Sequence, residues 1–529
     1  MSDAEKGGKE VVTAVVVSTL DSEDQERRDA ALGHLQRKLS SRQVSMISIA
    51  GTIGTGLFLG TGGALATGGP GSLVINYTLV GALMLILIRC VQELVTQFPI
   101  AGAWPAYFAR FVDEPSSFAF GWLTVFGNAI TLGGDLAATV LLMQFWTDHL
   151  TWLPALFFMV GLLATQLTTV KAFGELEYWL SLLKVVSIVI FFFLGIAVNA
   201  GANTSNEYIG ARNWTYGQAP FVGGFGGFAS LFVKAAYAYG GVDSVAFAAA
   251  EAKNPTRNIR RIANRTLWRV LIFYISTTVL IGFNIRTAAT SPFTLVFNLA
   301  GARAGGSFMN ATILTSVLSA CNMGCYSASR ALYGMALRGH APLFFSRLTR
   351  HGVPWAALLL VTLFSYVAFG LSFLPGGASA VWSYAQSLVG VNNQLQWLFI
   401  GIASWRMRSA WVKQGKSLSE LKAPNSGGNW ASRIIVVAFF FIVLIQRLST
   451  ATLAASTRRI SSRLELPILL ILYLGFRFIK GSRTPSLLEI DLVSGQYQDT
   501  EADEENNLEI ARREKGRFGL FWRVYGWVA

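Results

Sequence analysis

Charged side chains are scarce in this chain. Of its 529 residues, 14% are Asp, Glu, Lys or Arg, whereas an average soluble domain has about 25%. The mean hydropathy is +0.46 and 53% of the residues are hydrophobic. This balance excludes an ordinary soluble domain and indicates an all-α polytopic membrane protein.

Cysteine and histidine are also rare, which excludes several classes of protein. Cys90, Cys321 and Cys325 are too few for a disulfide framework, and no histidine lies near the last two at metal-ligand spacing. We find no phosphate-binding glycine loop and no Ser-His-Asp arrangement. We therefore expect no metal, no cofactor and no enzyme activity, and an ATP-driven pump is disfavoured.

The net charge of +14 raises the question of nucleic-acid binding. Lys and Arg fall mainly in loops between apolar runs, however, as they do in cytoplasmic loops of membrane proteins. Membrane lipids are therefore the expected partner of these charges, and nucleic acid is not.

Long apolar runs fill most of the chain and predict twelve transmembrane helices of about 20 residues each. We expect a disordered cytosolic tail at 1–42, a transmembrane domain at 43–480 and a cytosolic tail at 481–529. The runs lie at 45–68, 71–92, 117–146, 152–170, 179–199, 221–249, 267–284, 308–336, 354–374, 380–404, 434–446 and 464–479.

Basic residues set the expected orientation. With the N-terminus inside, the basic loops at 253–269, 338–350 and 406–422 all become cytoplasmic, as does the C-terminus. The run 434–446 does not fit this scheme well, because it is short for a span and arginines follow it. A tilted helix, a segment that is not a regular span and a damaged coding sequence all remain open there.

A glycine-rich stretch, 51–62, lies inside the first apolar run. Glycine is unfavourable in a helix interior, so this stretch predicts either a broken helix or a helix packed closely on a neighbour. The Gly56-x-x-x-Gly60 spacing fits close packing. A second glycine interruption in run 221–249 favours paired broken helices, which commonly form substrate sites in secondary transporters.

Several motifs resemble the fungal amino acid permeases of the amino acid–polyamine–organocation superfamily. The resemblance implies a LeuT-like fold, with two inverted repeats of five helices plus two C-terminal helices. It also implies proton-coupled import of amino acids across the plasma membrane. The motifs are the stretch 51–60, Arg110-Phe111-Val112-Asp113, Phe173-Gly174-Glu175-Leu176-Glu177-Tyr178-Trp179, Tyr239-Gly240-Gly241-Val242-Asp243 and 248–255.

The broken helices and the resemblance together suggest where an amino acid zwitterion binds. Free amides that begin the second half of a broken helix suit a carboxylate, and free carbonyls that end the first half suit an ammonium. We expect Gly54, Thr55 and Gly56 to bind the carboxylate, with Thr52 a weaker candidate. The expected ammonium side consists of Tyr237, Ala238, Tyr239 and Gly240, with Tyr239 either an aromatic lid or a packed core residue.

Charged residues inside apolar runs are costly and often functional. The resemblance makes Lys184 the leading proton-coupling candidate, with a lysine that reaches the inner interface as the alternative. Asp135 and Asp243 are further candidates, standing where relatives usually have Glu, and either one is a possible ion-pair partner of Lys234. A charged Lys234 facing the cavity would disfavour cationic substrates.

Other polar residues in the runs have simpler interpretations. Glu93 and Glu177 are expected near the cytoplasmic interface, and Asn310 and Asn322 in interhelical hydrogen bonds. A non-transporting amino acid sensor with the same fold is an alternative function. So is a permease for another amine, such as choline or 4-aminobutyrate. The sequence leaves open the substrate, the transport competence and the oligomeric state.

Overall fold

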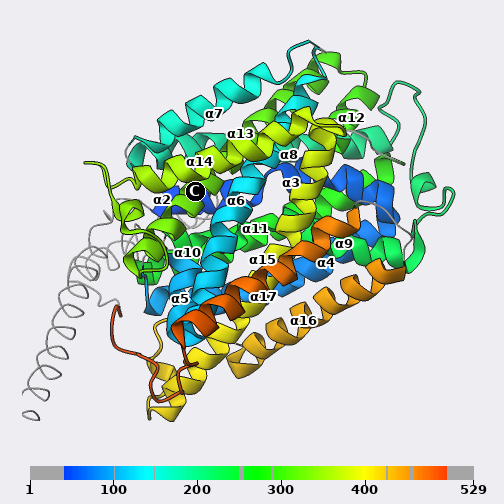
Figure 1. The fold of residues 1–529 in the computed structure, drawn as a ribbon. Coiled ribbons are helices and arrows are strands. Elements are labelled where there is room, and N and C mark those ends of the chain that lie inside the picture. Colours follow the sequence, from blue (N-terminus) through cyan, green and yellow to red (C-terminus); the bar gives the residue numbers. More distant parts are fainter. Residues whose placement is uncertain are drawn as a thin grey trace, which may run out of the picture.

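The computed structural model describes residues 41–100, 102–147, 149–168, 170–248, 255–286, 291–424, 427–452 and 458–496. Regular structure in these ranges is helical throughout, with no strand (Figure 1). The predicted tail at 1–42 lies almost wholly outside the described residues, as does 497–529.

The first half of the chain begins with a helix that is interrupted after its first three turns. Its pieces are α2 (Ser41–Thr52), α3 (Thr55–Phe58) and the start of α4 (Gly60–Gln97). Within α4 the backbone breaks again at Gly69 (φ +78°), directly before Pro70. The remaining helices of this half are α5 (Ala103–Phe111), α6 (Glu114–Met143), α7 (Leu153–Gln166) and α8 (Val170–Asn199).

The second half starts with another interrupted helix. It comprises α9 (Gly224–Ala238), the short turn η2 (Val242–Ser244) and α10 (Val245–Ala248). The helices that follow are α11 (Pro255–Asn284), α12 (Pro292–Leu299), α13 (Arg303–Leu337), α14 (Trp355–Gly370), α15 (Gly377–Lys413), α16 (Gly428–Thr452) and α17 (Arg458–Lys480).

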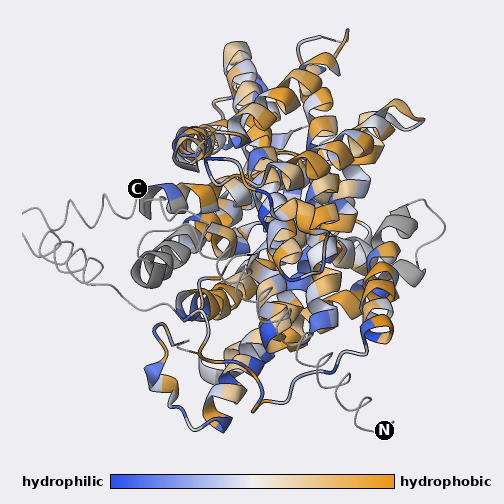
Figure 2. Cartoon of the chain, turned by 60° about the vertical axis from the view of Figure 1, so that its left-hand side comes forward, coloured by the Kyte–Doolittle hydropathy of each residue, from blue (hydrophilic) through white to orange (hydrophobic). Residues whose placement is uncertain are grey.

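The two interrupted helices lie among the long helices of the core. Helix α2 packs on α8, α11 and α13, and α9 packs on α4 and α15. Helix α6 contacts α13, α14 and α15, which places it across the middle of the molecule (Figure 1). Apolar residues cover much of the outer helices (Figure 2), as expected for helices that face lipid.

Five of the described helical segments are long and apolar enough to cross a membrane, and two shorter apolar helices accompany them. One of the five, Trp430–Leu448, lies in α16 and covers the run 434–446. Helix α16 has 25 residues, about 37 Å at 1.5 Å per residue. The interpretation of this region as too short, or as not a regular helix, is therefore wrong for the described residues.

Candidate functional site

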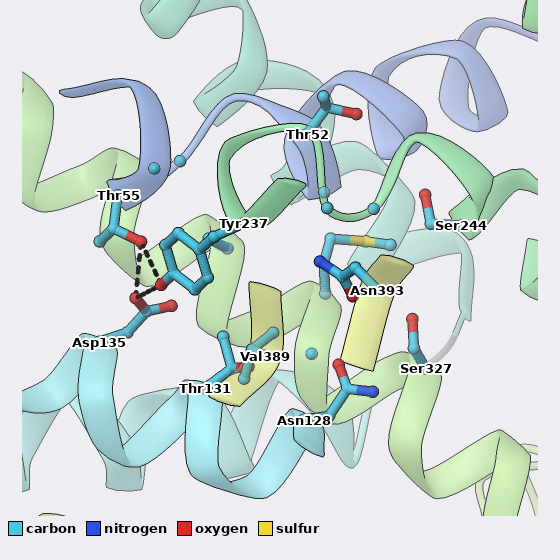
Figure 3. Close-up of a pocket in the computed structure, with 18 of the residues that line it drawn as sticks. Thr52, Thr55, Asn128, Thr131, Asp135, Tyr237, Ser244, Ser327, Val389 and Asn393 are labelled. Atoms are coloured by element: carbon cyan, nitrogen blue, oxygen red, sulfur yellow. Dashed lines mark hydrogen bonds between the residues drawn. The ribbon is translucent and has the colours of Figure 1, made fainter. Parts of the chain in front are cut away.

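A cavity of about 110 Å³ lies where the two interrupted helices face each other (Figure 3). Space for one water molecule takes roughly 10–15 Å³, so the cavity has room for a small solute. Its walls come from both helix breaks and from α6, α13 and α15. The lining residues are Gly51, Thr52, Gly54, Thr55, Gly56, Asn128, Thr131, Asp135, Tyr237, Ala238, Gly240, Gly241, Ser244, Ala320, Met323, Gly324, Ser327, Val389 and Asn393.

The break between α2 and α3 contributes residues to the cavity wall whose backbone amides lack a backbone acceptor in the described part of the chain. Gly54 has an extended backbone (φ −146°, ψ −150°), which ends one helix and lets the next begin. Among the described residues, the amides of Gly54, Thr55 and Gly56 have no backbone acceptor. The structure thus places the three predicted carboxylate-binding residues together on the cavity wall, with Thr52 beside them.

The α9 side differs from the expectation, because its last carbonyls already accept hydrogen bonds. The carbonyl of Tyr237 accepts from the Gly240 amide at 3.1 Å. The carbonyl of Ala238 accepts from the hydroxyl of Tyr274 at 2.7 Å. Since a carbonyl oxygen has two lone pairs, each retains one site for a cation.

Tyr274 on α11 was not predicted as a site residue from the sequence, yet its side chain forms hydrogen bonds to both interrupted helices. Its hydroxyl lies 2.9 Å from the carbonyl oxygen of Thr52, at the end of α2, as well as 2.7 Å from that of Ala238. The side chain is fully buried. A lone tyrosine in an apolar run carries no sequence signal for such a contact.

Tyr239, the predicted lid, does not line the cavity. It is fully buried and its hydroxyl donates to the carbonyl of Tyr77 at 3.0 Å. Its ring lies 4.6 Å from that of Tyr274. The alternative of a packed core tyrosine therefore describes its position, and Tyr237 is the tyrosine that borders the cavity.

Asp135 on α6 is the one charged residue among those that line the cavity. Its Oδ1 accepts from the hydroxyl of Thr55 at 2.8 Å and from that of Tyr237 at 3.3 Å (Figure 3). The two hydroxyls are themselves 3.0 Å apart. One carboxylate thus connects both broken helices through their side chains.

The two predicted partners of Lys234 bind other groups. Asp243 lies outside the cavity lining and its Oδ2 accepts from Gln396 at 2.6 Å. Lys234 donates to the carbonyl of Gly63 at 2.5 Å and to the hydroxyl of Thr67 at 2.7 Å. The proposed pairing of Lys234 with Asp135 or Asp243 is therefore wrong, and Lys234 does not line the cavity.

Lys184 lies behind the first break and is fully buried, so it does not reach the interface. Its ammonium donates to the carbonyl of Ala50 at 3.1 Å and to the hydroxyl of Ser319 at 2.9 Å. Ser319 in turn donates to Glu177 at 2.5 Å. Glu177 is 0% exposed, which corrects its placement at the interface.

Glu93 and the two asparagines show how other polar residues are used. Glu93 is 1% exposed and pairs with Arg408 at 2.6 Å, so it too is buried rather than interfacial. Asn310 donates to the carbonyl of Leu142 on α6 at 2.9 Å. Asn322 donates to Glu177 at 2.6 Å. Both asparagines thus make the expected interhelical bonds.

Close packing, the competing interpretation of the glycines, also applies. A Cβ on Gly56 would lie 2.5 Å from the Cα of Ala238. Gly241 has φ +84°, and a Cβ there would lie 2.3 Å from the carbonyl oxygen of Gly51. Only glycine fits these positions without movement of the backbone.

Several polar lining residues did not stand out in the sequence. Ser244 is the most notable, because its hydroxyl is buried and has no partner among the described residues. Asn393 on α15 donates to the carbonyl of Ala236 at 3.2 Å. Isolated polar residues in apolar runs were the available signal, and the periodicity of the run did not say which of them face inward.

Comparison with known proteins identifies a family model and several relatives of this chain. Residues 43–489 match the amino acid permease family model. The lysine-specific permease of Escherichia coli is 33% identical over 85% of this chain and 94% of its own length. The histidine permease of Lactococcus lactis is 32% identical over 87% of this chain and 98% of its own. Amino acid transporter 1 of Schizosaccharomyces pombe is 32% identical over 93% of this chain and 87% of its own length.

These relatives are transporters rather than enzymes, and the long apolar helices fit an integral membrane protein. The family model matches well over half of the chain. The relatives are matched along most of their own length. The chain therefore belongs to the amino acid permease family, within the amino acid–polyamine–organocation superfamily.

Proposed function

We propose that this permease is a secondary active transporter that imports amino acids with protons across the plasma membrane by alternating access. The proposal includes twelve transmembrane helices, with a LeuT-like pair of inverted five-helix repeats, and cytosolic termini. The observation that carries it is the cavity between two broken helices, bordered by unpaired amides on one and by carbonyls on the other.

The substrate carboxylate is assigned to the amides of Gly54, Thr55 and Gly56, where the helix dipole favours an anion. The ammonium is assigned to the carbonyls of Tyr237 and Ala238. Thr52, Tyr239 and Gly240 have supporting roles, Tyr239 by packing behind the site.

Amino acids with basic side chains are the proposed substrate class. Asp135 is the one acidic side chain among the lining residues and can supply a negative charge to the cavity when it is ionised, and Lys234, which would have opposed cations, points its ammonium at α4 instead. The relatives named for lysine and for histidine are consistent with this choice.

Lys184 is the proposed proton site, with Asp135 and Asp243 as further candidates. The Lys184 ammonium donates a hydrogen bond to the carbonyl of Ala50 in the last turn of α2, next to the cavity residue Gly51. Movement of α2 during transport would break this bond and change the surroundings of the ammonium. Loss and gain of its proton would thereby be linked to opening of the cavity.

The test uses the purified full chain in lipid vesicles with an imposed pH gradient. Lysine, arginine and histidine are expected to accumulate faster than leucine, glutamate, choline or 4-aminobutyrate. In Lys184→Ala a gradient of about one pH unit is expected to drive accumulation about tenfold less well, since such a gradient supplies about 1.4 kcal/mol, a factor of ten, only to a coupled carrier. Substrate exchange without a gradient is the control for folding.

Three outcomes would contradict parts of the proposal. Undiminished pH-driven accumulation in Lys184→Ala would remove its role. Faster uptake of choline or 4-aminobutyrate would favour the other amine permease. Binding of amino acids without any transport would favour a sensor.

A further inference from the structure

A buried polar chain leads away from Lys184 and is separate from the cavity. It consists of Lys184 and Glu177 on α8, Ser319 and Asn322 on α13, and Gln166 on α7, and none of these side chains is more than 5% exposed. The cavity is lined by other residues of α13, such as Ala320 and Met323.

Ser319 occupies the gap between the two charged residues. Lys184 and Glu177 are seven residues apart on α8, so their backbones are separated by about 10 Å along the helix axis. The Ser319 hydroxyl accepts from the Lys184 ammonium at 2.9 Å and donates to Glu177 Oε2 at 2.5 Å. A hydroxyl that accepts on one side and donates on the other is arranged for proton transfer.

Polar groups extend the chain beyond Glu177. Asn322 donates to Glu177 Oε1 at 2.6 Å, and Gln166 donates to Asn322 Oδ1 at 2.7 Å. Gln166 is the last residue of α7, and the next two residues, Leu167 and Thr168, are exposed. The chain thus reaches the end of the molecule at which α7 meets α8, which is cytosolic in the proposed orientation.

Charged groups on the neighbouring helices do not replace this route. The titratable groups that interact electrostatically with the Lys184 ammonium are Glu177, Asp135 on α6 and the thiol of Cys321 on α13. Asp135 is held by Thr55 and Tyr237 on the cavity side. Glu177 is the carboxylate that Ser319 connects to Lys184 by hydrogen bonds.

We propose that Glu177 accepts the transported proton from Lys184 through Ser319. Asn322 and Gln166, whose amides donate toward Glu177, position its carboxylate near the cytosolic end of α7. In this step an N–H bond of the Lys184 ammonium breaks as its proton joins Ser319 Oγ. The proton that Ser319 carried moves to Glu177 Oε2, which leaves a neutral amine and a carboxylic acid. Glu177 then releases the proton to water, and Lys184 takes up another when the cavity opens outward. This role rests on the proposed proton coupling.

Ser319→Ala and Glu177→Gln test the relay in vesicles that hold a pH-sensitive dye. Three quantities are measured: exchange of labelled lysine without a gradient, accumulation driven by a pH gradient, and proton influx that accompanies uptake. Both variants are expected to retain exchange within about twofold of the parent, while accumulation and proton influx fall at least about tenfold. Ser319→Thr keeps the hydroxyl and is expected to restore both.

Ser329→Ala is the matched control, because this buried serine of α13 bonds to the carbonyl of Tyr326 within its own helix. Normal coupling in Ser319→Ala would overturn the relay, as would loss of exchange in both relay variants, which would make the network structural. If the parent chain itself exchanges lysine but shows no proton influx, proton coupling fails and the relay with it.

Discussion

Tyr274 offers one hydroxyl proton to two carbonyl oxygens, one at the end of each interrupted helix. Removal of the hydroxyl in Tyr274→Phe leaves both carbonyls without this donor. An unsatisfied buried polar group costs about 1–3 kcal/mol. We expect the thermal unfolding midpoint of the detergent-purified protein to fall, and the affinity for substrate to fall with it.

Tyr77→Phe is the matched control for this prediction. Tyr77 lies in the same aromatic cluster, 6.0 Å from the Tyr274 ring, and its hydroxyl has no partner among the described residues. Its loss is expected to leave the midpoint unchanged or slightly raised. Equal effects of the two changes would mean that the ring, not the hydroxyl, holds the breaks together.

At the residue scale, the sequence predicted which segments form the site better than which side chains face it. Tyr237 and Tyr239 both precede the glycines of the second break, but only Tyr237 lines the cavity. Side chains that are two positions apart on a helix point about 200° away from each other. The rotation of α9 about its axis therefore decides which of the two tyrosines faces the cavity. Contacts with α4 and α15 set that rotation. The burial of Glu177 depends in the same way on α13, whose residues Ser319 and Asn322 lie 142 and 145 residues away in sequence.

At the scale of elements, the two breaks can work only if their helices approach closely. Gly56→Ala would place a methyl group 2.5 Å from the Cα of Ala238, so α3 and α9 must separate. Overpacking of this kind commonly costs about 1–3 kcal/mol. We expect a lower unfolding midpoint and a large loss of uptake, measured on the same preparation.

Gly63→Ala provides the comparison for Gly56→Ala. A Cβ at Gly63 would meet only the ammonium of Lys234, at an ordinary 3.6 Å. Alanine is favoured over glycine inside a helix by about 0.5–1 kcal/mol. This change is expected to be neutral or stabilising. Equal damage from both substitutions would contradict the close-approach argument for Gly56.

Elements were more predictable than side chains, for a physical reason. Glycine lowers the stability of a helix where it stands, so the breaks at Gly54 and Gly241 have a local cause. Helices nevertheless continue through other glycines, such as Gly63 and Gly81. The length of α16 was harder to predict from the sequence, because the helix continues at both ends through polar residues that lie outside its apolar run. Helix α16 also packs on α15 and α9, and no local sequence pattern reports such contacts.

At the scale of the whole molecule, the segment 481–496 returns to the body of the protein. Ile490 and Leu492 are 3% and 1% exposed. Gln414, directly after α15, donates to the carbonyl of Ile490 at 2.8 Å. Arg110 on α5 pairs with Asp491 at 2.9 Å. The segment thus ties α5 to the end of α15, so its attachment can be measured apart from transport.

Asp491 gives this attachment a defined pH dependence. Partial burial raises the pKa of its carboxyl, but the amides of Ser494 and Val493 and the Arg110 guanidinium outweigh burial and hold the pKa below its ordinary value. A group with a lowered pKa in the folded state stabilises that state above its unfolded pKa. This contribution disappears only as the pH falls through the lower, folded value. Attachment is therefore expected to be constant from about pH 8 to pH 5.

Hydrogen exchange of the amides in 481–496, measured on the full-length protein, checks this expectation. Asp491→Asn should increase exchange at every pH in that range, because the amide side chain has no charge to pair with Arg110. Glu489→Gln is the control, since Glu489 accepts its hydrogen bond from Ser486 within the same segment at 2.8 Å. If protection of the parent protein falls between about pH 7 and pH 5, a group that titrates there governs the attachment instead, because Asp491 remains ionised throughout that interval.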